Sequence, residues 1–340
     1  MTESRLSHIQ VDRHLSDDFI ATTLAADVRA GLGATPKYLP PKWFYDERGS
    51  ELFEEITRLP EYFPTRTERQ ILQQHAGEIA ALSGADTLVE LGSGSSEKTR
   101  LLLDAMLEAG TLRRYVPVDV SESALLGAAE ALLSDYPNLD VHVVLGDFEH
   151  HLDRLPSGGR RLVAFLGGTI GNLLPAERAS FLAQLRRGLA PGDSLLLGAG
   201  LVIDPAVLVP AYDDAAGVTA QFNLNVLSVL RREVEAILDP DAFDHVAVWE
   251  PEHEWIEMRL RARTAQRIDI PSLGVTADFA AGEEMRTEVS AKFHRDGLAA
   301  ELAAAGFRLD RWWTDPGNRF ALSLSTVQAE VPGGAAPDAR

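Results

Sequence analysis

The fold is decided by the stretch Leu88-Val89-Glu90-Leu91-Gly92-Ser93-Gly94-Ser95-Ser96-Glu97-Lys98-Thr99, in which the hydrophobic pattern changes within a few residues. The apolar run predicts a strand, the two glycines predict a tight turn, and residues 95–103 favour a helix. A turn of this kind aims backbone N–H groups at a ligand. Three ligand classes are bound in this way: dinucleotides, nucleoside triphosphates and S-adenosylmethionine.

Glu97 distinguishes between these three classes. A dinucleotide fingerprint has its third glycine at this position, and a P-loop has a glycine here before Lys98-Thr99. Because a carboxylate repels phosphates, both ligands are disfavoured. The sulfonium of S-adenosylmethionine is positive and carries no phosphate, so Glu90 and Glu97 are compatible with it. We therefore predict methyl-donor binding; the alternative is a glycine turn that only joins a strand to a helix.

The composition predicts one large or two modest domains of a soluble protein. The chain has 340 residues, 45% of them hydrophobic, and a formal net charge of -19. An acidic chain without a basic stripe repels nucleic acid and anionic membranes, which argues against a nucleic-acid methyltransferase. Cysteine is absent, so disulfides, thiolate nucleophiles and cysteine-ligated metals are excluded.

The expected location is the cytoplasm. No window approaches the ~20 consecutive apolar residues of a membrane span, and residues 1–13 lack the apolar core of a signal peptide. We expect neither a membrane nor a nucleic-acid partner. No sequence pattern reports the oligomeric state, and a monomer is the expectation we adopt.

Strand-like and helical patterns alternate between residues 87 and 197. The strand candidates are 87–91, 114–118, 140–145, 162–166 and 194–197, with a hairpin of 307–314 and 319–325 near the end. Repeated β-α units imply a parallel sheet covered by helices on both faces. The predicted fold class is therefore α/β, with a Rossmann-like sheet that the final hairpin turns into a mixed one. Small residues from 327 onward predict a disordered tail.

Other segments do not follow this alternation. Residues 37–46 place four aromatics around two prolines that hold the chain extended, and these rings can either plug a core or line a ligand site. Thr65 has the position of a helix N-cap, with Glu68 three residues later as in a capping box. Residues 204–290 are predicted to be an insertion of strands and helix, in which 267–279 form a hairpin.

Acids and glycines follow the predicted strands, and ligands bind at these ends of a parallel sheet. Asp119 can accept both hydroxyl hydrogens of a ribose, or it can cap the next helix. Asp147 can accept from an adenine amino group with Phe148 beside the ring, or it can belong only to a turn. Lys98 can neutralise the carboxylate of a bound methionine moiety, or it can extend along a solvated helix face. Gly167 follows the fourth strand.

The histidines do not predict a metal site. Glu149-His150-His151 and Glu252-His253-Glu254 have suitable side chains, but adjacent residues point to different sides and no i, i+4 histidine pair occurs. No GxSxG elbow is present, so serine hydrolase chemistry is not supported.

Several motifs together resemble one known family. They are Phe44-Tyr45-Asp46, Leu59-Pro60-Glu61-Tyr62, Glu90-Leu91-Gly92-Ser93-Gly94, Gly168-Thr169-Ile170-Gly171-Asn172 and Tyr212-Asp213-Asp214-Ala215-Ala216-Gly217-Val218-Thr219. Over about residues 27–324 the chain is similar to the histidine-specific Nα-methyltransferases of ergothioneine biosynthesis. Members transfer three methyl groups from S-adenosylmethionine to the α-amino group of L-histidine. The products are S-adenosylhomocysteine and Nα,Nα,Nα-trimethylhistidine, called hercynine.

The resemblance implies a site in two parts and no metal. The residues around the donor would be Tyr45, Phe53, Gly92, Gly94, Lys98, Asp119, Asp147, Phe148 and Gly167. The residues around histidine would be Tyr62, Asn172, Tyr212, Glu288 and Ser290. Asn172 and Tyr212 can donate to the substrate carboxylate. Glu288 and Ser290 can hold the imidazole, so that amino acids without ring nitrogens are rejected.

Tyr45 is the expected catalytic residue. Methyl transfer needs a neutral amine aligned with the sulfonium, so the protein supplies orientation and exclusion of water rather than acid–base power. Tyr45 can receive a hydrogen bond from the amine and help to position its lone pair. Tyr45 and Phe53 can also favour the cationic product through cation–π contact, on the order of 0.5 to 2 kcal/mol.

Two domains are expected, with histidine between them. A class I methyltransferase sheet would comprise residues 63–203 and 291–326, and an α+β substrate-binding domain would comprise 14–62 and 204–290. Two alternatives remain open: a methyltransferase that acts on another amino acid or small amine, and a non-catalytic regulator that binds S-adenosylmethionine. Retained preference for histidine in a Glu288→Ala variant would favour the first, and binding without turnover would favour the second.

Overall fold

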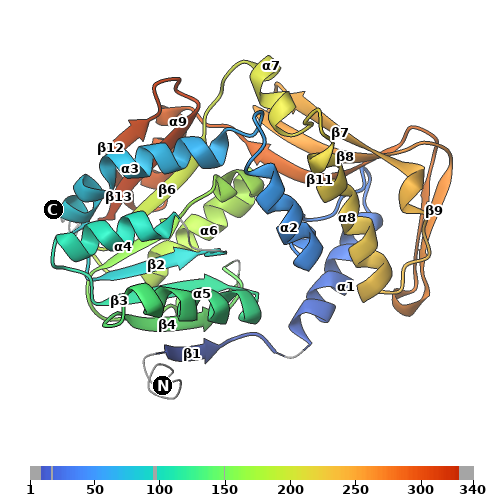
Figure 1. Ribbon diagram of the computed structural model, residues 1–340. Helices are drawn as coiled ribbons and strands as arrows, with labels where there is room; N and C mark the ends of the chain where they lie inside the picture. Colours follow the sequence, from blue (N-terminus) through green and yellow to red (C-terminus); the bar gives the residue numbers. More distant parts are fainter. Residues whose placement is uncertain (1–8, 17, 95–97, 149, 329–340) are drawn as a thin grey trace, which may run out of the picture.

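The computed structural model describes residues 9–328 except 17, 95–97 and 149 (Figure 1). Glu97, which distinguishes between the ligand classes, and the tail from 329 lie outside the described residues. Val327 is described, and the prediction that the disordered tail begins there is wrong: the residue is buried in the last strand of the central sheet.

The central sheet has eight strands in the order β1-β4-β3-β2-β5-β6-β13-β12. They are β1 (Ile9–Arg13), β2 (Thr87–Leu91), β3 (Arg114–Asp119), β4 (Asp140–Leu145), β5 (Arg161–Phe165), β6 (Ser194–Gly200), β12 (Phe307–Thr314) and β13 (Phe320–Val327). The first six are parallel, and β13 runs antiparallel to β6 and to β12. When the seven strands of this sheet other than β1 are renumbered 1 to 7 in chain order, the sheet order is 3-2-1-4-5-7-6.

Helices cover both faces of this sheet. They are α3 (Pro64–Ser83), α4 (Thr99–Glu108), α5 (Glu122–Asp135), α6 (Pro175–Gly188) and α9 (Arg295–Ala304). The apolar residues of α3, α4 and α5 belong to one buried cluster, and those of α6 and α9 belong to another on the opposite face. This arrangement confirms the predicted α/β class, and the five predicted strands differ from the observed ones only at their ends.

Two local predictions are corrected by the structure. β1 was not predicted, and it extends the edge of the sheet by pairing in parallel with β4. The capping box at Thr65 is wrong, because α3 begins at Pro64 and the preceding Phe63 makes no side-chain cap. Proline suits a first helical position, since its φ is already helical and it has no N–H to satisfy there. Glu68 is fully buried instead of capping the helix.

A second unit lies beside the sheet, on the right in Figure 1. Its antiparallel sheet has the order β11-β8-β7, and β9 and β10 form a separate hairpin. The strands are β7 (Phe243–Glu250), β8 (Trp255–Ala262), β9 (Gln266–Ile270), β10 (Val275–Phe279) and β11 (Glu284–Ala291). The helices are α1 (Phe19–Leu32), α2 (Glu47–Ile56), α7 (Pro205–Leu208) and α8 (Val218–Glu233). Single 3₁₀ turns occupy Pro41–Phe44, Leu152–Arg154, Thr169–Asn172, Val209–Ala211, Pro240–Ala242 and Pro271–Leu273.

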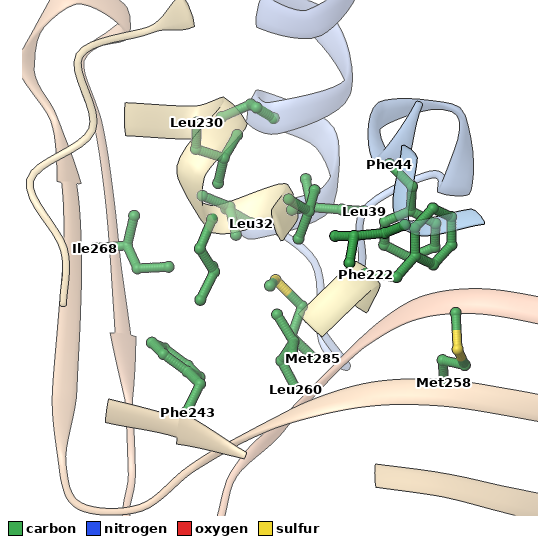
Figure 2. Close-up of a cluster of buried hydrophobic side chains, with 14 of the residues drawn as sticks. Leu32, Leu39, Phe44, Phe222, Leu230, Phe243, Met258, Leu260, Ile268 and Met285 are labelled. Carbon is green, nitrogen blue, oxygen red and sulfur yellow. The ribbon is translucent and has the colours of Figure 1, made fainter. Parts of the chain in front are cut away.

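This second unit has its own hydrophobic core, shown in part in Figure 2. All the buried hydrophobic residues of this core lie within 24–63 and 208–285. Phe44 is one of them and packs against Phe222, with their ring centroids 4.8 Å apart. The next residue, Tyr45, is 51% exposed. The aromatic segment 37–46 therefore does two things at once, because Phe44 fills a core while Tyr45 faces outward from it.

Candidate active site

Most of the predicted donor residues gather at the carboxyl ends of four adjacent strands, whereas Tyr45 and Phe53 lie in the second unit. Gly92 follows β2, Asp119 ends β3, Asp147 follows β4 and Gly167 follows β5. The strands are parallel, so these ends meet at one edge of the sheet. Gly92 has a φ of 68°, and a Cβ added at Gly94 would meet no atom within 4 Å. The turn therefore borders open space, as a ligand-binding turn requires.

Asp119 is bound to the glycine turn and to the chain that follows it. Its carboxylate accepts from the backbone N–H of Gly94 over 3.4 Å and from that of Ser121 over 3.1 Å. Burial raises its pKa above the usual value, against the effect of these N–H groups. The carboxylate therefore contacts the residue before α5 and lies beside the glycine turn.

Asp147 and Phe148 lie at the next strand end. Asp147 is buried, and its carboxylate lies 3.2 Å from the Nδ1 atom of His150. The ring of Phe148 packs against Phe165, with centroids 5.2 Å apart. A Cβ added at Gly92 would lie 4.0 Å from the Phe148 ring, so this ring borders the glycine turn.

Glu68 links Lys98 to the end of β5. Its buried carboxylate forms an ion pair with Lys98 and accepts from the backbone N–H of Gly167 over 2.8 Å. Gly198 makes room for it, because a Cβ there would lie 2.1 Å from the Glu68 Oε1 atom. Lys98 is therefore held at the donor edge of the sheet and does not extend along a solvated face. Sequence reasoning placed Glu68 in a cap and missed this contact.

Glu90, the acid of the opening stretch, lies behind the glycine turn. Its carboxylate accepts from the Thr99 hydroxyl and from the Tyr115 hydroxyl, both over 2.5 Å. Burial raises its pKa to about 7, although both hydroxyls act in the opposite direction. Glu90 is thus a structural acid that joins β2, β3 and the start of α4, and it does not face the open side of the turn.

Aromatic rings from the second unit form a continuous wall. Tyr45 contacts Phe53 and Phe222, with centroid distances of 5.5 and 5.4 Å. Phe53 contacts Tyr62 at 6.1 Å, and Tyr62 contacts Tyr212 at 6.5 Å. The surrounding protein, followed by the Glu288 carboxylate, raises the pKa of Tyr45 although half of its surface is accessible.

A β-bulge in β11 turns Glu288 toward this wall. Arg286 pairs with Arg259 of β8, whereas Glu288 pairs with Met258, so Thr287 is an extra residue. Strict alternation would put Arg286 and Glu288 on one face of the strand. The bulge instead leaves Arg286 beside the ion-paired Arg259 and moves Glu288 to the face where Met258 is buried.

Asn172 and Glu288 are directly bonded. The Asn172 amide nitrogen donates to the Glu288 carboxylate over 2.9 Å and to the Val289 carbonyl over 2.8 Å. Burial raises the pKa of Glu288 to about 7, opposed by Asn172 and by the charge of Lys292. With both amide hydrogens engaged, Asn172 can donate to a substrate carboxylate only by exchanging one of these bonds. In this arrangement it orients Glu288.

Tyr212, Ser290 and Lys292 form a triangle of hydrogen bonds. The Tyr212 and Ser290 hydroxyl oxygens are 2.7 Å apart, and the Lys292 ammonium donates to the first over 2.8 Å and to the second over 2.7 Å. Lys292 is buried. Sequence reasoning missed it, although residues 288, 290 and 292 share one face of an extended chain.

A second polar chain fixes Tyr212 relative to the bulge. His245 is held between the Asn223 amide nitrogen, 2.8 Å from its Nδ1, and the Tyr212 carbonyl oxygen, 2.8 Å from its Nε2. This pattern requires a neutral ring, and burial lowers the pKa of His245 accordingly. The Thr287 hydroxyl donates to the Asn223 Oδ1 atom over 2.6 Å. Tyr212 and the bulge are therefore parts of one network.

One loop carries residues of both predicted sets. Gly167 lies at the donor edge of the sheet, and Asn172, five positions later, is bonded to β11. Gly171 permits the contact between the two units, since a Cβ there would lie 2.8 Å from the Ala291 carbonyl oxygen. Among the described residues, no group of three His, Cys, Asp or Glu side chains is arranged to hold a metal ion.

The fold and the site define the class of the protein. The strand order, the antiparallel β13, the glycine turn after β2 and the acid at the end of β3 are those of a class I S-adenosylmethionine-dependent methyltransferase. Residues 24–327 match the model of the histidine-specific, S-adenosylmethionine-dependent methyltransferases. The chain belongs to this family.

The names of similar proteins agree with this family assignment. The chain is 59% identical to the histidine N-alpha-methyltransferase of Mycolicibacterium smegmatis and 57% identical to that of Mycobacterium tuberculosis. Each alignment covers 93% of this chain and 99% of the relative. Ergothioneine biosynthesis protein 1 of Neurospora crassa is 31% identical, over 85% of this chain and 33% of that protein.

Solved structures are more distant. The CcbJ methyltransferase of Streptomyces caelestis is 18% identical, with a TM-score of 0.43 over 76% of this chain and 90% of that chain. An S-adenosylmethionine-dependent methyltransferase of Clostridium acetobutylicum is 10% identical, with a TM-score of 0.46 over 82% of this chain and 99% of that chain.

Proposed function

We propose that this protein transfers three methyl groups from S-adenosylmethionine to the α-amino group of L-histidine, giving hercynine for ergothioneine biosynthesis. Family membership and the two mycobacterial relatives support the reaction and the substrate. The observation that carries the proposal for the site is the loop from Gly167 to Asn172, which joins the donor edge of the sheet to the Glu288 carboxylate.

The residues at the strand ends suit this donor. Gly92 and Gly94 leave the turn open, and Asp119 offers a carboxylate beside it. Asp147 and Phe148 are placed for the adenine, and Lys98 for the methionine carboxylate. When bound, S-adenosylmethionine supplies an electrophilic methyl group. The work left to the protein is to hold the amine in line with that methyl group and to exclude water.

Five residues are assigned to histidine. Glu288, ionised above a pKa of about 7, accepts from an imidazole N–H, and Ser290 binds the other ring nitrogen. Tyr212 donates to the substrate carboxylate, and Asn172 orients Glu288. Tyr62 lies in the aromatic wall between Phe53 and Tyr212. An amino acid without ring nitrogens leaves Glu288 buried and without a ligand partner, which disfavours its binding.

Tyr45 is the residue we assign to the reacting amine. Its ring belongs to the aromatic wall, and half of its surface is accessible. The hydroxyl receives a hydrogen bond from the amine and orients the nitrogen lone pair. The rings of Tyr45 and Phe53 stabilise the permanent cation of the product by cation–π contact.

The domain division and the setting also remain proposals. The separate core of residues 24–63 and 208–285 supports a substrate-binding domain of 14–62 and 204–290 beside a methyltransferase domain of 63–203 and 291–326. In the described residues no helix is long and apolar enough to cross a membrane. We propose a cytoplasmic enzyme on the strength of the composition, and we keep the expectation of a monomer.

Mass spectrometry of the product tests the function directly. Purified protein, excess S-adenosylmethionine and L-histidine should give a species heavier by three methyl groups at full turnover. Fewer than three methyl groups would contradict trimethylation, and donor binding without turnover would favour a regulator. Calorimetric titration of histidine with and without S-adenosylhomocysteine measures the coupling of the two sites.

A further inference from the structure

Lys292 has an unusual environment for a lysine. Its ammonium is buried, donates to the Tyr212 and Ser290 hydroxyls, and lies 4.9 Å from the centroid of the Tyr212 ring. Among the described residues, no carboxylate oxygen lies within 4.0 Å of it. The charge of Lys292 acts on Glu288, but the two side chains form no ion pair. A buried ammonium without a directly paired anion is costly, and a ligand that brings a negative charge would relieve this cost.

The hydrogen-bond pattern also leaves one hydroxyl hydrogen that can be donated to a ligand. An ammonium can only donate, so the Tyr212 and Ser290 oxygens both act as acceptors toward Lys292. One of the two hydroxyl hydrogens joins the oxygens to each other across 2.7 Å. The other hydrogen is then free to be donated to a ligand. The triangle therefore presents one O–H donor backed by a positive charge, which is the complement of a carboxylate.

We propose that Lys292 is the residue that makes a free α-carboxylate obligatory in the substrate. This inference rests on the proposed function. Lys292 acts through Tyr212 as a positioning residue: its ammonium orients the Tyr212 hydroxyl as a donor and supplies the counter-charge for the carboxylate. The enzyme accordingly selects a free amino acid and rejects histidinamide, histamine and a histidine that is followed by a peptide bond.

Binding measurements with two ligands test this role. L-Histidine and L-histidinamide, which has a neutral amide in place of the carboxylate, are titrated by calorimetry into protein saturated with S-adenosylhomocysteine. In the wild type histidine should bind about 100-fold more tightly than histidinamide. In Lys292→Met, histidine affinity should fall about 30-fold or more while histidinamide affinity changes by less than about 3-fold. Lys292→Arg should recover part of the preference.

The controls separate selectivity from structure. Lys37→Met removes another lysine with little exposure, which pairs with Glu283 at the opposite end of β11, and should leave the ratio of the two affinities unchanged. S-Adenosylhomocysteine affinity reports that each variant is folded. If Lys292→Met does not fold, Lys292→Gln keeps two N–H donors without the charge and should give the same loss of preference.

The inference is overturned if Lys292→Met weakens both ligands equally, or if the wild type binds both equally. Mass spectrometry keeps the two proposals apart. Hercynine formation with an unchanged affinity ratio in the variant would defeat only the role of Lys292. A ratio that depends on Lys292, in a protein that does not methylate histidine, would defeat only the proposed reaction.

Discussion

The Glu68 carboxylate accepts a hydrogen bond from the backbone N–H of Gly167 over 2.8 Å, although the two residues are 99 positions apart. The same carboxylate is paired with Lys98. One buried acid on α3 therefore holds both the lysine assigned to the methionine carboxylate and the first residue of the loop that leads to Asn172. Donor binding and the position of the substrate loop are linked through this side chain.

Glu68→Gln should weaken donor binding. The amide keeps the size of the side chain but no longer holds Lys98 in position by an ion pair, so we expect S-adenosylhomocysteine affinity to fall about 10-fold and the free energy of unfolding to drop by about 1 to 3 kcal/mol. Calorimetry and urea unfolding measure the two effects. Glu78→Gln, on the exposed end of the same helix, is the matched control. Equal donor affinity in both variants would refute the role of Glu68.

Glu90 should make stability depend on pH. Its folded pKa of about 7 lies above the ordinary 4.5, so the folded state binds the proton more tightly than the unfolded state does. The free energy of unfolding should therefore fall as pH rises from about 4.5 to about 7 and should be constant above that range. Glu90→Gln removes this contribution, since an amide can accept from one hydroxyl and donate to the other.

Urea unfolding at pH 5 and pH 8 provides the comparison. The free energy of unfolding of Glu90→Gln, measured relative to that of the wild type, should increase by about 1 to 3 kcal/mol from pH 5 to pH 8. Glu288 also has a raised pKa, but its contribution is common to both proteins and cancels in the difference. Glu130→Gln, on the exposed face of α5, should run parallel to the wild type. A parallel curve for Glu90→Gln would contradict the assignment.

Most of the central sheet could be predicted because its signals are local. A buried parallel strand is a short apolar run, and the glycine turn after β2 marks where the chain turns into a helix. β1 lacks such a signal, since its side chains at the edge of the sheet are partly buried or exposed. Predicted site residues such as Asp119 and Phe148 also followed from their place at strand ends.

The missed residues depend on contacts that no local pattern reports. Glu68 lies in a polar helix start and is buried only because Gly198, far along the chain, makes room for it. Lys292 lies two residues after Ser290, on the strand face that also carries Glu288, so the alternation of side chains along a strand could have indicated it as a site residue. The bulge at Thr287 has no such signal, since its pairing is set by the neighbouring strand.

Thr287→Val should disturb the histidine site without affecting the donor site. The substitution keeps the shape of the side chain but leaves the Asn223 Oδ1 atom without its donor, at a cost of about 1 to 3 kcal/mol of folding free energy. A looser bulge lets Glu288 move, so histidine affinity should fall about 10-fold.

Calorimetry of both ligands checks this separation. S-Adenosylhomocysteine affinity should stay within about 2-fold of the wild type, because most of the donor residues lie at the strand ends of the central sheet. Thr276→Val, which removes an exposed hydroxyl bonded to Asp269 on β9, is the control. An unchanged histidine affinity in Thr287→Val would mean that the bulge does not depend on this hydroxyl.

The aromatic wall should act mainly on the cationic product. Phe53→Leu removes one ring next to Tyr45, so hercynine affinity should fall about 2- to 30-fold, the range that corresponds to a cation–π contact, while histidine affinity changes less.

Tyr45→Phe keeps the ring and removes the hydroxyl, so it should slow methylation about 10-fold without the same loss of hercynine affinity. Tyr38→Phe, in the same aromatic segment, is the control for the hydroxyl. Single-turnover rates for each of the three methylations distinguish the two effects, because only the last product carries the permanent charge. If both variants carry out all three steps at wild-type rates and bind hercynine with wild-type affinity, neither the Tyr45 hydroxyl nor the Phe53 ring takes part.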